Sequence, residues 1–379
     1  MKKIFGVLPL VVLFMLFATG CTTQPKILIG FSGELTGTQS ELGVSARNAA
    51  VLAVEEINNN GGINGKQIQL LIEDDLGTPE GARAADLRLV ERDALVIIGH
   101  MTSSQTLAAW EAVRDSGVIL FSPTTSTPEL SSQDDNFLRF IAVNTRESAL
   151  LAQHIAAQPN LQEIAILYDA DNPGYADTFQ ENLAQHFIEA NGKPPRAIAF
   201  HGRAALDFSE LIQPLLTEPP DAVVIIASAY NTALIVQQMR LNQINCPIFI
   251  ALWARTEDLI RIGGASVDGI QFISQYDTPA PSDAAQQFSQ KFQQRYGSAP
   301  TFSALVTYDI VYFLASGLQI TNGSRKNLKQ TLLSLSPYEG LLGTVQMDAY
   351  GDVERVQYLG TIQNGVFIGL YSVYRPAAP

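Results

Sequence analysis

Short β-branched and apolar runs alternate with helical patterns from Lys26 onward. In the first series, residues 26–30, 67–73, 94–99 and 118–122 read as strands. Helical patterns cover residues 44–59, a stretch opened by Thr78-Pro79-Glu80, and a stretch capped by Ser103 or Ser104 that runs to about residue 116. Strands that alternate with helices in this way predict a parallel sheet covered by helices.

A second series of the same kind follows Asn144. Its predicted strands are residues 164–168, 197–200, 222–227, 247–251 and 269–273, and its predicted helices are 175–191, 208–217 and 231–242. After the Pro-rich residues 277–281, the pattern predicts helices at 283–296, 302–320 and 325–334, then strands at 343–347, 356–362 and 366–373. Asn364-Gly365 is typical of a two-residue hairpin turn. Two βα series predict two doubly wound lobes.

The N-terminal segment has the pattern of a secretory signal. Lys2 and Lys3 precede the apolar residues 7–17 and the small residues Ala18-Thr19-Gly20. The apolar stretch is too short for a bilayer-spanning helix, and no later segment is expected to span one either. Residues 18–21 resemble the lipobox of bacterial lipoproteins. That resemblance implies a signal peptide over 1–20, lipid attachment at Cys21 and a tether over 21–26, whereas a plain signal peptide cut near Gly20 is the alternative.

Composition narrows the class of protein. The chain has 379 residues, 46% of them hydrophobic and 16% charged, which suffices for two folded domains. A net charge of −13 and the absence of any basic run argue against nucleic acid as a partner. Once Cys21 is lipidated, Cys246 remains as a lone buried thiol, so no internal disulfide is expected.

No catalytic, metal or cofactor motif is found. The four histidines are scattered, and neither a G-x-S-x-G elbow nor a Walker-type loop is present. The paired acids Asp74-Asp75 and Asp134-Asp135 fall near predicted loops or strand ends, where solvated charge or helix-start chemistry is the expected role. The sequence therefore gives no support for an enzyme, and no metal or cofactor is expected.

Hydroxyl and aromatic residues gather just after the predicted strand ends. In open α/β sheets, ligands bind outside the carboxyl ends of the strands. The segments concerned are residues 99–104, 122–126, 168–175, 228–230 and 252–255. Their placement predicts a binding cleft.

Several stretches, in order along nearly the whole mature chain, resemble the leucine/isoleucine/valine-binding protein family. They are residues 33–37 (GELTG), 53–65 (AVEEINNNGGING), 73–75, 96–104 (VIIGHMTSS), 121–123, 128–130 and 307–309 (TYD). Members of this family are extracytoplasmic receptors of ABC importers with the type I periplasmic-binding-protein fold. The resemblance implies an α/β protein with two doubly wound parallel-sheet lobes joined by three crossovers. It places lobe 1 at 27–143 plus 275–355 and lobe 2 at 144–274 plus 356–379.

The resemblance also assigns ligand-binding residues. Ser103 matches the serine that holds the ligand carboxylate at a helix N-terminus, where free N–H groups favour an anion. Ser126 matches a threonine of the family, and Thr124 matches a residue that contacts the ligand through its backbone. Tyr175 and Tyr230 match aromatic residues of the second lobe that cover the ligand.

Trp253 stands where amino-acid-binding members carry an acid that pairs the ligand ammonium. Because an unpaired buried ammonium is strongly unfavourable, another acid must serve, or the ligand lacks an amine. The acids considered are Asp171, Glu41 and Glu257. The family's cysteine pair is replaced by Gly77 and Thr102, so the loop before Ser103 lacks that crosslink.

The expected function is that of an extracytoplasmic receptor of an ABC importer. It binds a branched-chain or other hydrophobic amino acid between its lobes and delivers it to permease subunits while a lipid anchors it to the membrane. The alternatives are an aromatic or aliphatic acid without an amine as the ligand, or a sensory receptor in place of a transport receptor.

Overall fold

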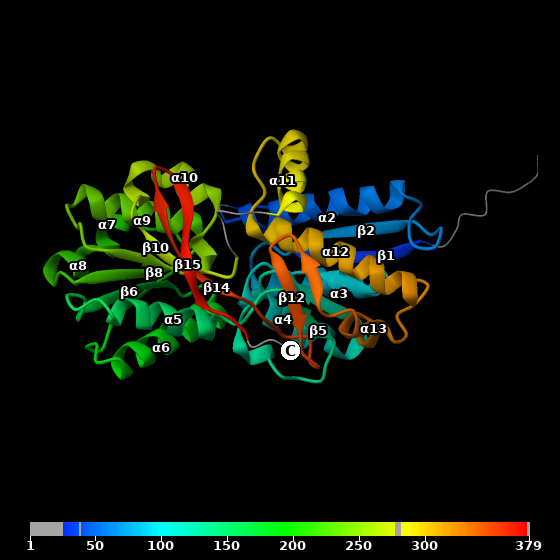
Figure 1. Cartoon of the computed structure of the whole chain (residues 1–379), viewed down its shortest axis with the longest axis horizontal. Helices are drawn as coiled ribbons and strands as arrows, with labels where there is room; N and C mark the ends of the chain where they lie inside the picture. The colour runs from blue at the N-terminus through cyan, green and yellow to red at the C-terminus, as the bar shows by residue number, and fades with distance from the viewer. Residues whose placement is uncertain (1–25, 38, 277–281, 377–379) are drawn as a thin grey trace, which may run out of the picture.

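The computed structural model describes residues 26–37, 39–276 and 282–376. The expected signal peptide, Cys21 with most of its tether, and the Pro-rich residues 277–281 lie outside this range. Two parallel sheets with their helices form two lobes that lie side by side (Figure 1).

Lobe 1 is built on a five-stranded parallel sheet in the order β2-β1-β3-β4-β5. Its strands are β1 Ile27–Gly33, β2 Ile68–Asp74, β3 Val96–Ile98, β4 Ile119–Ser122 and β5 Phe137–Arg139. Every residue of β3, β4 and β5 is buried, as expected for strands covered by helices on both faces. The helices of this part of the lobe are α2 Glu41–Asn59, α3 Pro79–Glu91 and α4 Ser103–Val113.

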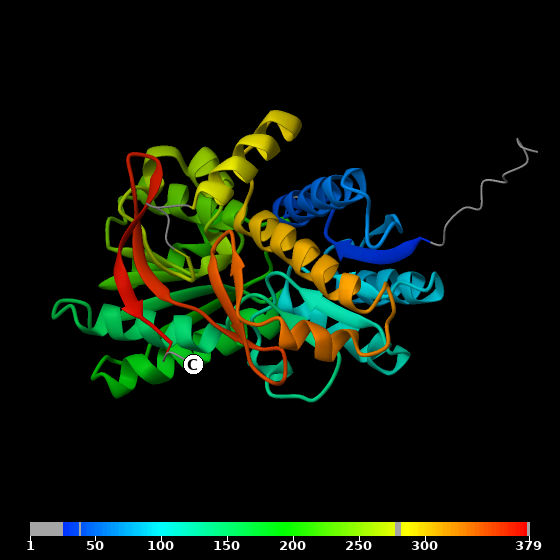
Figure 2. The ribbon, with the colours of Figure 1, turned by 45° about the vertical axis from the view of Figure 1, so that its right-hand side comes forward.

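Lobe 2 is built on a seven-stranded sheet in the order β15-β14-β10-β9-β8-β6-β7. Strands β6 Ile164–Asp169, β7 Arg196–Phe200, β8 Ala222–Ile226, β9 Ile248–Ile250 and β10 Gln271–Ser274 run parallel, and β14 Gln357–Gln363 and β15 Val366–Tyr374 add an antiparallel hairpin. This hairpin forms one edge of the sheet, and Figures 1 and 2 both show it in red on the side of lobe 2 that faces the viewer.

Alternation along β8 explains how the lobe 2 sheet is covered on both faces. Val223 and Ile225 pack in the same cluster as α9 Ala229–Leu241, whereas Val224 and Ile226 pack in the cluster that contains α6 Pro173–Glu189. Successive strand residues point to opposite faces, so an uninterrupted apolar strand needs a helix layer on each side. The remaining helices of this lobe are α5 Asn144–Ala156, α7 Phe208–Leu211, α8 Gln213–Thr217 and α10 Glu257–Gly263.

The chain passes between the lobes three times: after β5, after β10 and again just before β14. The segment between the second and third passages belongs to lobe 1 and carries α11 Asp283–Tyr296, α12 Phe302–Ile320, α13 Leu328–Ser334 and the small antiparallel sheet β11 Tyr338–Gly340, β12 Gly343–Met347 and β13 Val353–Glu354. The predicted α/β class with two parallel-sheet lobes is confirmed.

Helix α12 corrects one expectation about membrane-spanning segments. By length and composition it is apolar enough to cross a bilayer, whereas no segment after the N-terminus was expected to be. In the structure, 67% of that stretch is buried, and the helix packs on α2. A helix that is apolar around most of its circumference suits a position inside a core.

Two local predictions are wrong. Residues 208–217 form two short helices, α7 and α8, with Pro214 in the first turn of the second, because proline cannot continue a helical hydrogen-bond ladder. Neither Ser103 nor Ser104 caps α4: Thr102 occupies the N-cap position in an extended conformation and makes no capping hydrogen bond. Ser103 is therefore the first helical residue, with its side chain free for another role.

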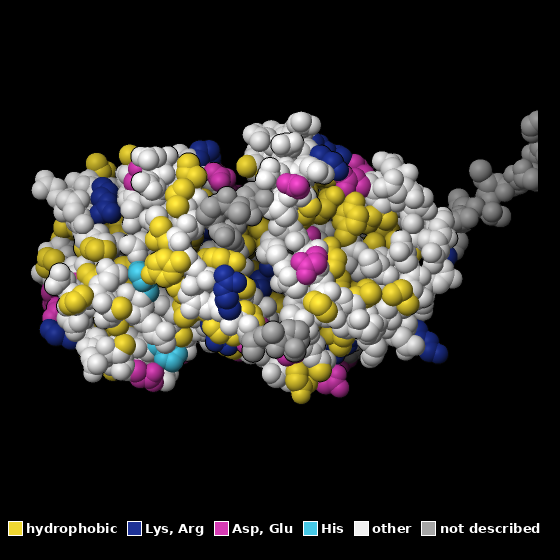
Figure 3. Space-filling view, in the orientation of Figure 1, with side chains coloured by type: hydrophobic (Ala, Val, Ile, Leu, Met, Phe, Trp, Pro, Cys, Tyr) yellow, Lys and Arg dark blue, Asp and Glu magenta, His cyan; other side chains and the backbone are white. Residues whose placement is uncertain are grey.

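The surface carries no continuous basic patch on the face seen in Figure 3. Lys and Arg side chains appear there singly or in small groups among acidic and uncharged ones. This distribution is consistent with the net charge of −13.

Candidate functional site

A small cavity lies between the two lobes at the carboxyl ends of their strands. It is lined from lobe 1 by Leu42, Met101, Thr102, Ser103, Thr124, Ser126, Ile141 and Phe302, and from lobe 2 by Glu147, Asn172, Tyr175, Leu252 and Trp253. Its volume is about 30 Å³. This is room for very few water molecules, so any amino acid or aromatic acid enters only when the lobes or the lining side chains move apart.

The N-terminus of α4 forms one wall of this cavity. The hydroxyls of Thr102 and Ser103 are buried there and have no hydrogen-bond partner. Buried polar groups are normally hydrogen-bonded. Two orphan hydroxyls beside the positive end of a helix therefore provide a place for an anionic group.

Thr124 and Ser126 follow β4 and line the same wall. The Thr124 hydroxyl donates to the Met101 carbonyl at 2.8 Å, so this side chain holds the loop before Ser103. Ser126 is buried, and its carbonyl accepts the Asn144 amide at 2.9 Å. The structure thus brings Ser103, Thr124 and Ser126 together around one cavity.

Tyr175 and Trp253 form an aromatic wall on the lobe 2 side. Their rings meet edge to face with centroids 5.8 Å apart and planes at 73°. The Tyr175 hydroxyl is buried without a hydrogen-bond partner, and burial raises its pKa well above the usual value. Tyr230 lies apart from them: it is 36% exposed and lines a neighbouring small pocket that it shares with Trp253. Trp253, buried between the two pockets, separates Tyr230 from the main cavity.

Glu147 is the carboxylate that lines the cavity, and it was not among the acids considered from the sequence. It lies in the first turn of α5 with only 1% of its surface exposed. One of its oxygens accepts the Leu252 amide at 2.7 Å. Burial raises the pKa of its carboxyl to about 8, although the hydrogen bond from Leu252 opposes that shift. The helical pattern of residues 144–156 is the signal that could have located Glu147. No helix was predicted there.

The three acids considered from the sequence lie elsewhere. Asp171 accepts from the His201 ring at 2.8 Å, Glu41 accepts from Thr256 at 2.5 Å, and Glu257 lines a different cavity. Glu41 contributes to the small pocket beside Trp253, and burial raises its pKa to about 7. None of the three lines the main cavity.

The lobes touch directly beside the cavity. The Ser104 amide at the start of α4 donates to the Asn172 side chain at 3.1 Å, and the Gly174 amide at the start of α6 donates to the Ser104 hydroxyl at 3.1 Å. Farther out, Arg203 of lobe 2 forms two hydrogen bonds with the Glu34 carboxylate of lobe 1, at 2.7 and 3.1 Å. These contacts hold the structure in a closed arrangement.

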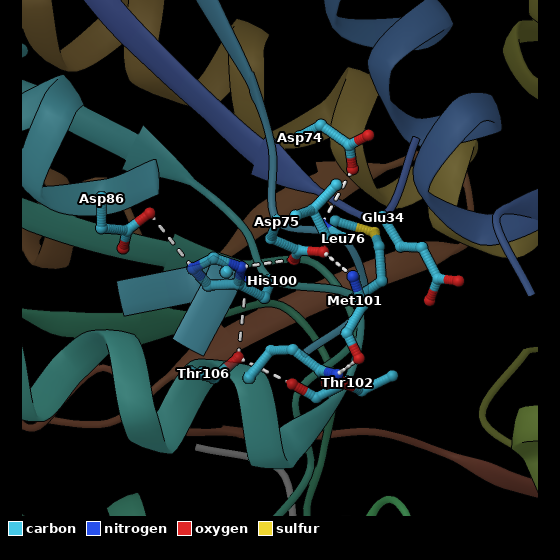
Figure 4. A network of polar contacts seen from close by, with 12 residues as sticks. Glu34, Asp74, Asp75, Leu76, Asp86, His100, Met101, Thr102 and Thr106 are labelled. Carbon is cyan, nitrogen blue, oxygen red and sulfur yellow. Dashed lines mark hydrogen bonds and ion pairs between the residues drawn. The ribbon is translucent and has the colours of Figure 1, made fainter. Parts of the chain in front are cut away.

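Behind the α4 wall, a buried ionic network fixes the loop that carries Thr102 and Ser103 (Figure 4). His100 is fully buried between Asp75, at 2.7 Å, and Asp86, at 3.1 Å. These two carboxylates raise the pKa of His100 to about 10 against the opposing effect of burial. The prediction that Asp75 is solvated or starts a helix is wrong: the chain folds so that His100 covers it.

Near Gly77 and Thr102, where the resemblance implies that a cysteine pair is replaced, other contacts join the two loops. The Gln105 side chain donates to the Gly77 carbonyl, and the Asp75 carboxylate accepts the Gly77 amide at 2.8 Å. Together with the Asp75–His100 pair, these bonds supply a noncovalent link between the loops.

Other candidate chemistry is sparse in the described part of the chain. No group of three or more His, Cys, Asp or Glu residues there is arranged to hold a metal ion. Cys246 is half-buried, where full burial was expected, and burial raises the pKa of its thiol.

Comparison with known proteins gives one family match. A family model described as periplasmic binding protein matches residues 26–365. An amino acid binding protein of Pseudomonas aeruginosa is 24% identical over 94% of this chain and 96% of its own length.

Two solved structures are similar in fold. A branched-chain amino acid transporter substrate-binding protein of Streptococcus pneumoniae, in complex with isoleucine, has a TM-score of 0.81 at 24% identity, with 92% of this chain and 100% of that chain covered. A solute-binding protein of an ABC transporter from R. palustris, in complex with benzoate, has a TM-score of 0.83 at 17% identity, with 92% and 96% covered.

Proposed function

This chain belongs to the periplasmic binding protein family, and we propose that it is the solute receptor of an ABC importer for a hydrophobic amino acid. The observation that carries the proposal is the cavity between the lobes, where unpartnered hydroxyls at the α4 N-terminus face buried aromatic rings and a carboxylate. The apolar side chains of Leu42, Ile141 and Phe302 complete the lining.

In this proposal the ligand carboxylate binds at the start of α4. The Ser103 hydroxyl donates to it, Ser126 supplies a second hydroxyl, and Thr124 contributes backbone contacts. Each such hydrogen bond to a charged group contributes roughly 1.5 to 3 kcal/mol. Tyr175 and Trp253 cover the ligand from lobe 2, and Tyr230 stands at the edge of the site.

Binding is coupled to closure because the two walls belong to different lobes. A ligand that contacts both walls favours the closed arrangement by its extra affinity for that state. The permease subunits then recognise the closed receptor. We take the lobes to be residues 27–143 plus 275–355 and residues 144–274 plus 356–379.

The receptor works outside the cytoplasmic membrane. Residues 1–20 serve as the signal peptide, and a lipid on Cys21 holds the folded part at the membrane through the tether 21–26. Mass spectrometry of Cys21 in membrane fractions, compared with Cys21→Ala, tests the anchor.

One observation favours a second ligand class, an aromatic or aliphatic acid without an amine. Trp253 lines the cavity, and the resemblance implies that it stands where amino-acid-binding members of the family carry an acid. The solved relative that holds benzoate shares the fold. In this version the indole stacks on the ligand, and Glu147 remains protonated.

A ligand screen by thermal shift tests the proposal. Leucine, isoleucine, valine and phenylalanine are compared with benzoate and 4-methylpentanoate, since a ligand above its dissociation constant raises the unfolding temperature. We expect Ser103→Ala to weaken the best ligand by about 1 to 3 kcal/mol, roughly tenfold per 1.4 kcal/mol, in calorimetry.

The matched control is Ser334→Ala, on the exposed end of α13, which should leave affinity unchanged. Equal affinities in Ser103→Ala and the parent protein would remove Ser103 from the site. Failure of every compound in the screen would contradict the proposed ligand classes.

A further inference from the structure

Glu147 is an ionisable group buried in the cavity without a cationic partner. Among the described residues, no Lys, Arg or His forms an ion pair with Glu147. The Leu252 amide donates a hydrogen bond to its carboxylate. Its neighbour Arg146 pairs with Glu354 at 3.0 Å and lies over the Tyr374 ring. The basic side chain next to Glu147 in sequence is therefore engaged elsewhere.

The titratable groups that face Glu147 are two tyrosines. The charge of Glu147 contributes to raising the pKa of Tyr175 from α6 and of Tyr276 after β10, and each tyrosine is itself buried. Neither can neutralise a carboxylate. Burial accordingly keeps the Glu147 carboxyl protonated near neutral pH, with a pKa of about 8.

The opposite wall of the cavity has the complementary character. Thr102 and Ser103 present orphan hydroxyls at the start of α4, which favours an anion. Glu147, Tyr175 and Trp253 gather on the other side, where a carboxylate and aromatic faces favour a cation. Because the two walls belong to one cavity, its polarity fits a molecule that carries both charges.

We infer that Glu147 pairs the ammonium of an amino-acid ligand, in place of the acid that the family carries at the position of Trp253. The inference rests on the proposed function and specifies its ligand class as a zwitterion. The ligand carboxylate lies at the α4 N-terminus, its ammonium contacts the second oxygen of Glu147, and its apolar side chain packs against Leu42, Ile141 and Phe302.

Pairing with a ligand ammonium changes the protonation state of Glu147. Glu147 must ionise to pair with an ammonium, so binding of an amino acid near neutral pH releases up to one proton from this carboxyl. The affinity for an amino acid then rises as the pH rises toward about 8, where the free protein also loses the proton. An acid without an amine leaves Glu147 protonated and releases none.

The test varies two groups independently: the amine of the ligand and the carboxyl of residue 147. Calorimetry measures leucine and 4-methylpentanoate, which is leucine's carbon skeleton without the amine, against the parent protein and Glu147→Gln. We expect Glu147→Gln to weaken leucine by roughly 30-fold or more and 4-methylpentanoate by less than about threefold. Titrations at pH 7 in buffers of different ionisation enthalpy should detect proton release only for leucine with the parent protein.

Two further variants serve as controls for this comparison. Glu257→Gln makes the same chemical change at an exposed residue of another cavity and should leave both affinities unchanged. Glu147→Asp keeps the charge and should retain part of the leucine affinity, which covers the case in which the glutamine variant does not fold.

The outcomes separate this inference from the proposed function. Parallel losses for both ligands, or an unchanged leucine affinity in Glu147→Gln, would overturn the role of Glu147 while the receptor function stands. Binding of amine-free acids alone would also overturn it and would select the second ligand class. Binding of neither kind of compound by the parent protein would reject the proposed function itself.

Discussion

The raised pKa of His100 favours its protonated form in a place fully shielded from solvent. It lies between Asp75 and Asp86, on the loop that leads to Thr102 and Ser103. A buried charge is tolerated only when it is paired, and removal of one partner leaves the others uncompensated. The geometry of the loop that carries Thr102 and Ser103 thus depends on the charge state of a residue behind it.

Replacement of His100 by glutamine should destabilise the protein by roughly 3 to 5 kcal/mol at pH 6, because two buried carboxylates lose their cation. The pKa of His100 is raised in the folded state, so its stabilising effect is complete below about pH 6.5 and is lost as the pH rises toward about 10. Urea unfolding of both proteins across pH 6 to 10 should show the difference shrinking with pH. A constant difference would mean that the imidazole acts by packing alone.

At the scale of elements, two helix starts meet across the cleft. The Gly174 amide at the beginning of α6 donates to Ser104 at the beginning of α4. A side chain at position 174 would meet Leu107 Cδ1 at 2.8 Å and the Ser104 amide at 3.3 Å. A β-carbon at this close approach of the two lobes would force the Leu107 side chain to shift.

Gly174→Ala should therefore impair closure and leave each lobe intact. We expect ligand affinity to fall by about three- to tenfold, on the order of 1 kcal/mol, in calorimetry, while the unfolding temperature of the ligand-free protein does not fall. The double variant Gly174→Ala with Leu107→Ala removes the clashing methyl group and should recover much of the affinity. No recovery in the double variant would argue against the steric explanation.

Some elements follow from local chemistry, and others do not. Thr78 caps α3 as predicted, by accepting the Gly81 amide at 3.0 Å, and Asn364-Gly365 adopts the positive φ angles of a two-residue hairpin turn. Strand β5 and helix α5 were not predicted. With α5 missing, Glu147 had no element to place it near the cleft.

At the scale of the molecule, the closed arrangement is held by few polar contacts. Arg203 and Glu34 form the bidentate pair between the lobes, and Glu34 is buried there. Burial raises the pKa of the Glu34 carboxyl, and its bonds to Arg203 oppose the rise. Opening of the lobes would expose both groups to water.

Arg203→Met should shift the ligand-free protein toward the open state and weaken ligand binding by roughly tenfold, about 1.4 kcal/mol. Small-angle scattering should show a larger radius of gyration without ligand. Arg196→Met is the matched control, because Arg196 pairs with Glu218 inside lobe 2 at 2.7 Å. If both variants lower affinity equally, the effect is not one of closure.

Most of the succession of strands and helices, the two-lobe α/β class, and the cluster of Ser103, Thr124 and Ser126 at strand ends follow from the sequence, whereas β5 and α5 do not. These features depend on periodicity and turn chemistry within short stretches, so they can be derived without a structure. The resemblance also predicts that Trp253 stands where the family carries an acid, and this stays a prediction.

Which side chains face one another follows from the tertiary fold and not from the local sequence. Glu147 reaches the cavity because the chain crosses into lobe 2 just before α5. Trp253 lines both the main cavity and the pocket of Tyr230, and His100 covers Asp75. Such contacts join residues far apart in the chain, and burial raises the pKa of the Glu147 carboxyl to about 8. The orientation of one lobe against the other decides what faces Glu147, and packing within lobe 1 decides what covers Asp75. No local pattern encodes either.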